Sequence, residues 1–197
     1  IIHSLMMLAP LVRPDTVVTD AGSTKVAITA AASLLPCRFV GGHPLAGKAE
    51  RGASAADAQL FSGRPYVLTS EPPAEFLEWL KAIGAIPVRM SPEQHDRVVA
   101  LTSHLPQLAS TALAAELASL DQADLAVSGP GLADMTRLAG SSWDIWADIL
   151  QTNAGPVSAA LDRYIARLQK LRASLPEAGA EFETGNTVSA RVRRPGQ

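Results

Sequence analysis

Residues 38–47 have the sequence RFVGGHPLAG, and this stretch decides how the rest of the chain is interpreted. A short apolar run that ends in glycines is typical of a buried strand running into a turn. The glycines give the backbone conformational freedom, and Pro44 favours an extended conformation at His43. We therefore expect an imidazole at the carboxyl end of a strand, where open α/β sheets bind ligands. An isolated GGHP is equally consistent with a turn histidine that has no task.

The composition indicates a folded protein with a substantial core, because 47% of the 197 residues are hydrophobic and 18% are charged. A net charge of −2 gives no reason to expect nucleic acid or membrane partners. The single cysteine, Cys37, excludes an internal disulfide framework and a multi-cysteine metal site, and we expect no metal. With no secretory signal and no bilayer-length apolar run, the sequence predicts a soluble cytoplasmic protein.

The first half of the sequence alternates between two patterns. Strand patterns occur at residues 16–20, 38–42, 65–69 and 86–90, and helix patterns at 25–34, 53–61 and 74–83, with a further helix already under way at the start. This alternation predicts a parallel, doubly wound sheet over residues 1–91. Residues 86–90 are expected at a sheet edge because of their internal proline.

The second half is predicted to be helical throughout. Ser91 and Pro92 match the N-cap and first position of a long apolar helix that we expect to kink at Pro106. Shorter helices are expected at 132–138, 142–150 and 157–173. Because so apolar a helix is normally buried by other helices, we expect residues 92–174 to form a homodimer. Residues 175–197 have little periodicity, which predicts a flexible tail.

Several polar residues within these elements allow two interpretations. The hydroxyl of Ser23 or Thr24 could cap the helix at 25–34 or contact a ligand. His95, near a helix start, is expected to be a surface or capping group, and His104 could be a core histidine that is satisfied by protein partners. Arg137 precedes Trp143 and Trp146, and an arginine in so apolar a neighbourhood needs an anionic partner from the protein or from a ligand.

The order of these motifs resembles the prephenate/arogenate dehydrogenase family of tyrosine biosynthesis. The match is carried by DAGSTK at 20–25, GGHPLAG at 41–47, His95-Asp96, SHLP at 103–106, and Thr136-Arg137 with Trp146. The resemblance implies an α/β fold followed by an all-α one: the distal part of a Rossmann-like parallel sheet, then a C-terminal helical dimerisation domain. It also implies an oxidoreductase that uses NAD or NADP to oxidise and decarboxylate prephenate to 4-hydroxyphenylpyruvate, or arogenate to tyrosine.

The resemblance further implies roles for individual residues. His43 matches the catalytic base that takes the proton of the substrate's C4 hydroxyl. Ser23 matches the serine that orients this hydroxyl and the nicotinamide, and Gly22 and Ser23 are expected at the cofactor. Arg137 matches the arginine that binds a substrate carboxylate, for which a planar bidentate cation is well suited. Further substrate contacts are expected from His104, Gln107 and Trp146.

The chain contains no G-x-G-x-x-G after any predicted strand. We expect either a fragment without the first part of a Rossmann domain or a protein that has lost its pyrophosphate site, and in both cases a chain that alone binds neither NAD nor NADP. Two alternatives are a related NAD(P)-dependent hydroxyacid dehydrogenase and a non-catalytic dimerisation or ligand-binding module. His43 disfavours the first alternative, because those enzymes typically use a lysine as the base.

Overall fold

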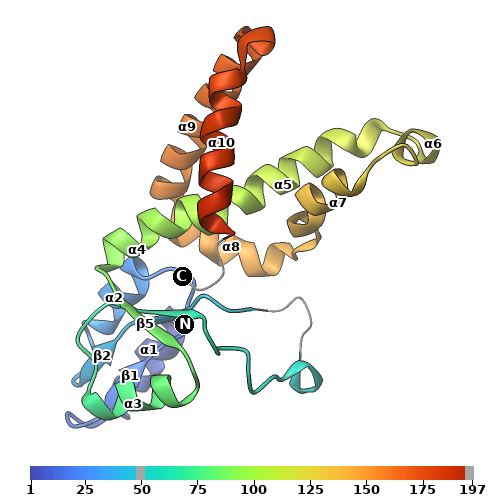
Figure 1. The fold of residues 1–197 in the computed structure, drawn as a ribbon. Helices are drawn as coiled ribbons and strands as arrows, with labels where there is room; N and C mark the ends of the chain where they lie inside the picture. Colours follow the sequence, from blue (N-terminus) through green and yellow to red (C-terminus); the bar gives the residue numbers. More distant parts are fainter. Residues whose placement is uncertain (48–51, 194–197) are drawn as a thin grey trace. The chain divides into compact units, whose positions relative to one another are not determined.

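A computed structural model describes residues 1–47 and 52–193. The chain divides into two compact units, residues 1–157 and residues 158–197. Figure 1 shows the strands in the first unit, with α10 and most of α9 in the second. The helices are α1 (Ile2–Leu8), α2 (Val26–Ala32), α3 (Ala74–Ala82), α4 (Pro92–Val99), α5 (Leu105–Glu116), α6 (Gln122–Leu125), α7 (Pro130–Thr136), α8 (Trp143–Thr152), α9 (Ala154–Ala173) and α10 (Gly179–Val192).

The strands form two small sheets, and the chain passes from one sheet to the other within residues 38–44. The strands are β1 (Val17–Thr19), β2 (Arg38–Val40), β3 (Gly42–Pro44), β4 (Pro65–Leu68) and β5 (Ile86–Arg89). β1 pairs with β2 in parallel, and β4 pairs in parallel with β5, which lies at the edge as expected. β3 follows β2 after the single residue Gly41 and pairs with β4 in antiparallel orientation. The α/β class and the parallel pairings are confirmed, but the strands form two small sheets rather than one, and the three-stranded sheet is mixed.

The described part of the connection between β3 and β4, residues 45–47 and 52–64, contains no crossover helix, which fits the antiparallel pairing of these strands. The helix expected at 53–61 is wrong: the structure has only a 3₁₀ turn there, Ala53–Ala55. Asp57 instead accepts a hydrogen bond from the backbone N–H of Gln59 at 2.9 Å, a local turn that competes with helix formation. A parallel pair needs a crossover connection, whereas an antiparallel pair does not.

The apolar core of the sheet region consists of two clusters. Val40, Tyr66, Leu68, Leu80 and Ala85 are buried where α3 covers the strands, and Leu5, Ile28, Ala32 and Leu35 are buried between α1 and α2. Val40 and Leu68 are 0% exposed, and truncating Leu68 to alanine should cost about 2–5 kcal/mol. These clusters fix the strand ends that carry the polar site.

A long helix leads from the sheet region into the helical region of the first unit. Ser91 caps α4 as predicted, because its hydroxyl accepts a hydrogen bond from the N–H of Gln94. Between α4 and α5, residues Ala100–His104 form a π-helical turn, so the irregularity expected at Pro106 lies directly before it. No helix in the described part of the chain is long and apolar enough to cross a membrane.

The second unit differs from the irregular tail expected over residues 175–197. α10 occupies Gly179–Val192, and Glu181 in its first turn pairs with Arg167 and Lys170 of α9. These ion pairs link positions that lie 14 and 11 residues apart in the sequence, so sequence periodicity does not reveal them. Whether α10 is loosely attached stays a prediction, and residues 194–197 lie outside the described part.

Candidate active site

A buried ion pair fixes the backbone beside His43. The carboxylate of Asp20, just after β1, pairs with the ammonium of Lys25 and accepts a 2.9 Å hydrogen bond from the N–H of Gly42. Lys25 Nζ also donates to the carbonyl oxygen of Gly42 at 2.6 Å. A Cβ on Gly42 would lie 2.6 Å from the carbonyl oxygen of Asp20. Gly42 therefore permits close approach, and its φ is not positive.

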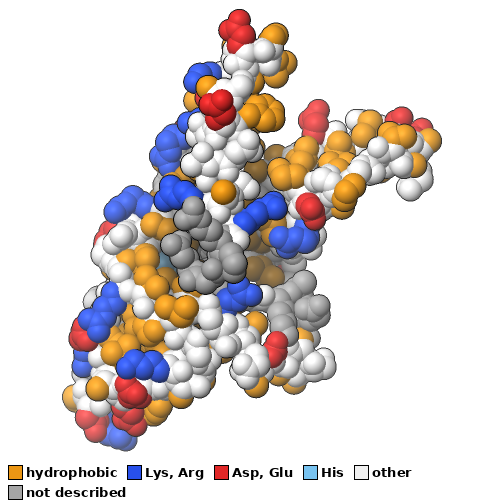
Figure 2. Space-filling model, viewed as in Figure 1, with side chains coloured by type: hydrophobic (Ala, Val, Ile, Leu, Met, Phe, Trp, Pro, Cys, Tyr) orange, Lys and Arg blue, Asp and Glu red, His pale blue; other side chains and the backbone are white. Residues whose placement is uncertain are grey.

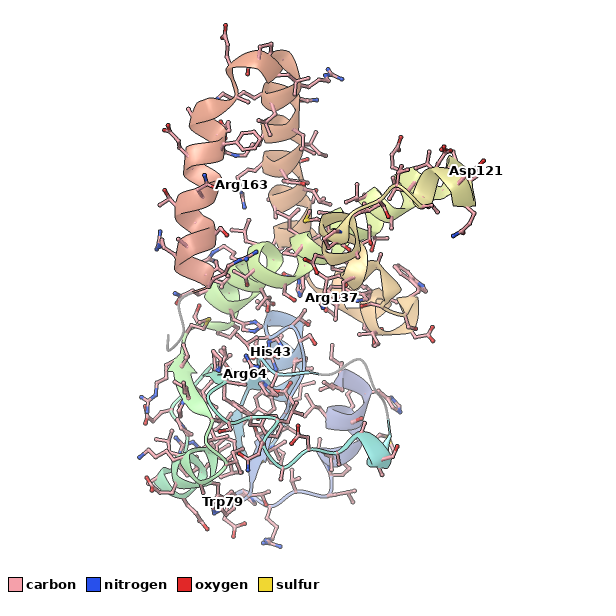
Figure 3. The ribbon with its side chains drawn as sticks, turned by 45° about the vertical axis from the view of Figure 1, so that its right-hand side comes forward. His43, Arg64, Trp79, Asp121, Arg137 and Arg163 are labelled. Atoms are coloured by element: carbon pink, nitrogen blue, oxygen red, sulfur yellow. The ribbon has the colours of Figure 1, made fainter. Side chains whose placement is uncertain are left out.

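His43 is the end of a chain of three side chains that runs into α4. His43 Nδ1 lies 2.8 Å from His95 Nε2, and His95 Nδ1 lies 2.7 Å from Asp96 Oδ1. His95 is 0% and Asp96 2% exposed, so the expectation that His95 is a surface or capping group is wrong. Figure 3 shows His43 in the sheet region, close to where the long helix begins.

The same carboxylate of Asp96 caps α2 from a distant part of the sequence. It accepts hydrogen bonds from the backbone N–H of Lys25 at 2.7 Å and of Val26 at 2.9 Å. The expected cap from Ser23 or Thr24 is therefore wrong, since no local side chain caps this helix. Burial alone would raise the pKa of Asp96, but the hydrogen bonds from His95, Val26 and Lys25 lower it overall.

These contacts determine which nitrogen of His43 carries the proton. An ionised Asp96 can only accept, so His95 donates from Nδ1, and neutral His95 then accepts at Nε2. His43 must donate from Nδ1, which leaves the lone pair on its Nε2 free. Burial, followed by the charges of His95, Lys25 and His104, lowers the pKa of His43 to about 3. His43 is thus a neutral hydrogen-bond acceptor at physiological pH.

A second histidine is held by residues of the helical region. His104, at the end of the π-helical turn, is 1% exposed, and its Nδ1 lies 3.2 Å from Asn153 Nδ2. Asn153 Nδ2 also donates to the carbonyl oxygen of Asp96 at 2.8 Å. The ring of Trp146 packs edge-on against His104, with centroids 5.8 Å apart. Burial lowers the pKa of His104 to about 4.

An open cavity of about 760 Å³ lies beside the first turn of α2. Its polar wall contains Gly22, Ser23 and Thr24, and the hydroxyl of Thr24 lies 2.8 Å from that of Thr152 in α8. Apolar residues make up about half of the lining, with polar residues of α8 among the rest: Ile1, Ile2, Ala27, Ile28, Ile145 and Ile149 are apolar, and Asp148 and Gln151 are polar. The volume is within the range of small-molecule sites.

Gln107 acts as an anchor inside the helical region. Its side-chain Nε2 donates to the carbonyl oxygen of Leu138 at 2.8 Å, and the hydroxyl of Ser110 accepts from the N–H of Ala139 at 3.1 Å. Both bonds hold the 3₁₀ turn Arg137–Gly140 against α5. Arg137 itself is exposed and forms no ion pair with any residue that the structure describes.

Two family models together match nearly the whole chain. Residues 1–86 match the nucleotide-binding domain of prephenate dehydrogenase, and residues 91–183 match its dimerization domain. The chain belongs to the prephenate dehydrogenase family.

Individual relatives agree with this assignment. The chain is 33% identical to a cyclohexadienyl dehydrogenase of Zymomonas mobilis, an alignment that covers 89% of this chain and 64% of the relative. It is also 33% identical to a prephenate dehydrogenase of Bacillus subtilis, with 91% of this chain and 53% of the relative covered. The chain thus spans about one half to two thirds of the length of the curated relatives it matches.

Solved structures show the same fold. The crystal structure of arogenate dehydrogenase from Synechocystis superposes with a TM-score of 0.81 at 30% identity, covering 96% of this chain and 74% of that one. Prephenate dehydrogenase from A. aeolicus, in complex with hydroxyphenyl propionate and NAD⁺, also gives 0.81 at 30% identity, covering 98% of this chain and 71% of that one. The α/β region followed by helices is therefore the family's architecture.

The residues predicted from the resemblance fall into three groups in this prephenate dehydrogenase-family chain. Gly22 and Ser23 line the cavity, whereas His43 lies in the chain of side chains that ends at Asp96. The third group belongs to the helical region: His104 contacts Trp146, and Gln107 anchors the turn that begins at Arg137. None of the third group lines the 760 Å³ cavity, and their substrate roles stay predictions.

Sequence reasoning missed three residues of the site. Lys25 and Asp96 belong to the motifs DAGSTK and His95-Asp96, but the sequence indicated no function for either residue. Asn153 belongs to none of the motifs. A buried charge needs a partner, so Lys25 in an otherwise apolar helix start was the available signal. Asn153 gave none, because its partners Asp96 and His104 lie 57 and 49 residues away in the sequence.

Proposed function

We propose that the protein containing this chain catalyses the NAD(P)-dependent oxidative decarboxylation of prephenate or arogenate. The observation that carries the proposal is the free Nε2 lone pair of His43, set by the contacts to His95 and Asp96. A neutral imidazole with a fixed acceptor nitrogen is suited to take a proton from a hydroxyl group. The similarity to named prephenate, cyclohexadienyl and arogenate dehydrogenases supports this substrate class.

The residues around the cavity fit the nicotinamide end of a dinucleotide. Gly22 leaves no room for a side chain, since a Cβ there would lie 2.5 Å from the Ile28 side chain, so the backbone itself forms the wall. The isoleucines that line the cavity suit a flat ring, and the Ser23 hydroxyl offers a polar contact to its amide. When bound, the nicotinamide would accept a hydride from the substrate.

In the proposed mechanism His43 acts on the C4 hydroxyl of the substrate ring. The hydroxyl O–H bond breaks and its proton moves to His43 Nε2, while the hydride leaves C4 and a C4 carbonyl forms. The C1 carboxylate then leaves as carbon dioxide, its electron pair completes the aromatic ring, and the C4 carbonyl oxygen becomes a phenolate that takes up a proton from solvent. His95 keeps His43 oriented throughout, and the Asp96 carboxylate stabilises the positive charge that reaches His43.

Binding of the anionic substrate is assigned to the helical region. Arg137 is exposed, and its planar guanidinium offers the two parallel N–H donors that suit a ligand carboxylate. Ser23 would orient the C4 hydroxyl, and His104, Gln107 and Trp146 would surround the rest of the substrate. Gln107 can offer its Oε1 only as an acceptor, because its Nε2 is committed to Leu138 and Thr111.

We also propose a cytoplasmic homodimer. The apolar side chains of α5 are incompletely covered within the first unit, and Leu101, Val127 and Met135 nearby are 45%, 89% and 58% exposed. Figure 2 shows hydrophobic side chains gathered over α5 and α7. The match of residues 91–183 to a dimerization domain supports a second copy as the covering partner.

The test is an assay of the purified full-length protein that contains this chain, with prephenate and with arogenate, each with NAD⁺ and NADP⁺, following reduced nicotinamide. Turnover of either substrate, together with carbon dioxide release, is the expected result. Turnover only of small hydroxyacids would favour the hydroxyacid dehydrogenase alternative. Specific dimer formation without any turnover would favour the non-catalytic module.

A further inference from the structure

The orientation of the Asn153 amide is fixed by a partner that can only accept. Asn153, 2% exposed at the end of α8, has its Nδ2 2.8 Å from the backbone carbonyl oxygen of Asp96. A carbonyl has no proton to donate, so the atom facing it must be the NH₂ group. The same NH₂ group has a second hydrogen, and His104 Nδ1 lies 3.2 Å away.

His104 must therefore accept at Nδ1. A proton on Nδ1 would face the NH₂ group of Asn153, donor against donor, in a buried environment where both would lose their bonds. Neutral His104 thus carries its proton on Nε2, the opposite arrangement from His43. The Nε2 of His104 has no hydrogen-bond partner in the described part of the chain. In that part, Thr29 Oγ1 is the one fully buried side-chain polar atom without a partner, so His104 Nε2 is not fully buried. His104 as a whole is 1% exposed, so its Nε2 keeps at most a small accessible surface in this structure.

We propose that Asn153 is a positioning residue that holds His104 as an Nε2–H hydrogen-bond donor, complementary to the acceptor Nε2 of His43. Asp96 connects the two histidines. Its carboxylate fixes the proton position of His43 through His95, and its backbone carbonyl fixes that of His104 through Asn153. One buried residue thereby fixes a donor and an acceptor of opposite kind.

This arrangement selects the chemistry of the group that His104 meets. A neutral N–H donor binds a carbonyl or carboxylate oxygen and disfavours an ammonium group, which also can only donate. Resting on the proposed function, we assign the partner of His104 to a carbonyl or carboxylate oxygen of the substrate. The assignment of the proton to Nε2 does not depend on that function.

The proton positions can be measured directly, because the chain has four histidines. Long-range ¹H–¹⁵N correlation spectra of the ¹⁵N-labelled protein at neutral pH should show His104 as the Nε2–H form and His43 as the Nδ1–H form, assigned with His104→Gln and His43→Asn. His104 observed as the Nδ1–H form or as a cation would overturn the proposal.

Two variants test whether Asn153 is the cause. Asn153→Asp should convert His104 to the Nδ1–H form, because a carboxylate accepts. Asn153→Leu should give a mixture of the two forms. Ser110→Ala is the matched control, since it removes a buried hydrogen bond of the helical region without touching a histidine, and should leave His104 unchanged. If both Asn153 variants keep the wild-type spectrum, Asn153 has no positioning role.

A kinetic measurement tests the substrate part separately. Asn153→Leu should raise KM about tenfold, the loss expected when a hydrogen bond to a charged group is weakened, with a smaller change in kcat. An unchanged KM beside the expected spectra would overturn the substrate contact alone. Wild-type protein inactive with both prephenate and arogenate would overturn the proposed function and leave the spectroscopic result standing.

Discussion

His43 is the side chain whose replacement should affect the chemistry most directly. His43→Asn keeps a polar group opposite His95 but cannot take a proton. We expect kcat to fall about 10²–10⁴-fold, the usual contribution of a general base, which is roughly 3–5 kcal/mol. KM should change little, because carboxylate binding is assigned to Arg137. Steady-state kinetics of a correctly folded variant within about threefold of the wild-type kcat would return His43 to the role of a turn residue.

The buried neutral histidines predict how stability depends on pH. The pKa values of His43 and His104 are lowered to about 3 and about 4 in the folded state, whereas the unfolded chain binds these protons near pH 6.5. The unfolded state therefore binds more protons below pH 6.5, so the free energy of unfolding falls as the pH falls towards about 4. Urea denaturation at pH 7 and pH 5 checks this prediction.

A variant identifies the groups responsible. His104→Gln should reduce the difference in denaturation midpoint between pH 7 and pH 5, because one titrating group is gone. The pKa of Asp96 lies below its ordinary value, so protonating its carboxylate also lowers the free energy of unfolding. This happens only at a pH below the range from 7 to 5 of the denaturation experiment. Equal midpoints at the two pH values in the wild type would contradict the buried, neutral state of both histidines.

Arg137 tests substrate binding in the helical region. Arg137→Lys keeps the charge but loses the bidentate fork, so KM should rise more than kcat falls. Arg13→Lys, at an exposed arginine that pairs with Asp15, is the matched control and should leave both constants unchanged. An unchanged KM in Arg137→Lys would show that this arginine does not bind the carboxylate.

At the scale of elements, Asp96 joins α4 to α2. Asp96→Asn places an NH₂ group where both oxygens now accept, so at least one N–H of the α2 N-terminus or His95 loses its acceptor. We expect a loss of about 1–3 kcal/mol in the free energy of unfolding together with a lower kcat. Denaturation and kinetics measured on the same preparation check this.

Ser91→Ala provides the comparison for Asp96→Asn. It removes the N-cap of α4 and should cost about 1 kcal/mol of stability without lowering kcat, because the Ser91 hydroxyl bonds to the N–H of Gln94 and to Glu93, neither of which belongs to the proposed site. A variant Asp96→Asn with wild-type kcat would mean that the carboxylate serves the helix alone.

How well the elements could be predicted depended on where their contacts lie in the sequence. The strands at 38–42 and 65–69 and the Ser91 cap were predictable, because alternation and capping are local properties. The cap of α2 was not, because Asp96 lies 70 residues or more from the N–H groups it accepts from. The burial of His95 likewise depends on a distant segment, because it packs against His43 of β3, 52 residues away in the sequence. His43 was therefore predictable as a site residue, whereas its hydrogen-bond partners His95 and Asp96 were not.

At the scale of the whole molecule, the apolar helical region predicts association. We expect a homodimer through residues 92–174 at micromolar concentration, because α5 buries only Gln107 and Ser110 fully within one chain. Sedimentation equilibrium measures this directly. A well-folded monomer would refute the prediction, because the partly exposed leucines of α5 would then need no partner chain to cover them.

The π-helical turn at Ala100–His104 sets the rotational phase of the long helix. A π-helical turn holds about one residue more than an α-helical turn, and each residue advances an α-helix by about 100°. The faces of α4 and α5 are consequently offset by about a quarter of a rotation from those of an uninterrupted helix. His95 and Asp96 can then face the sheet region while Gln107 and Ser110 face the turn at Arg137. If the same five residues were wound as a regular α-helix, the two halves of the site would be rotated out of phase with each other by about that quarter turn.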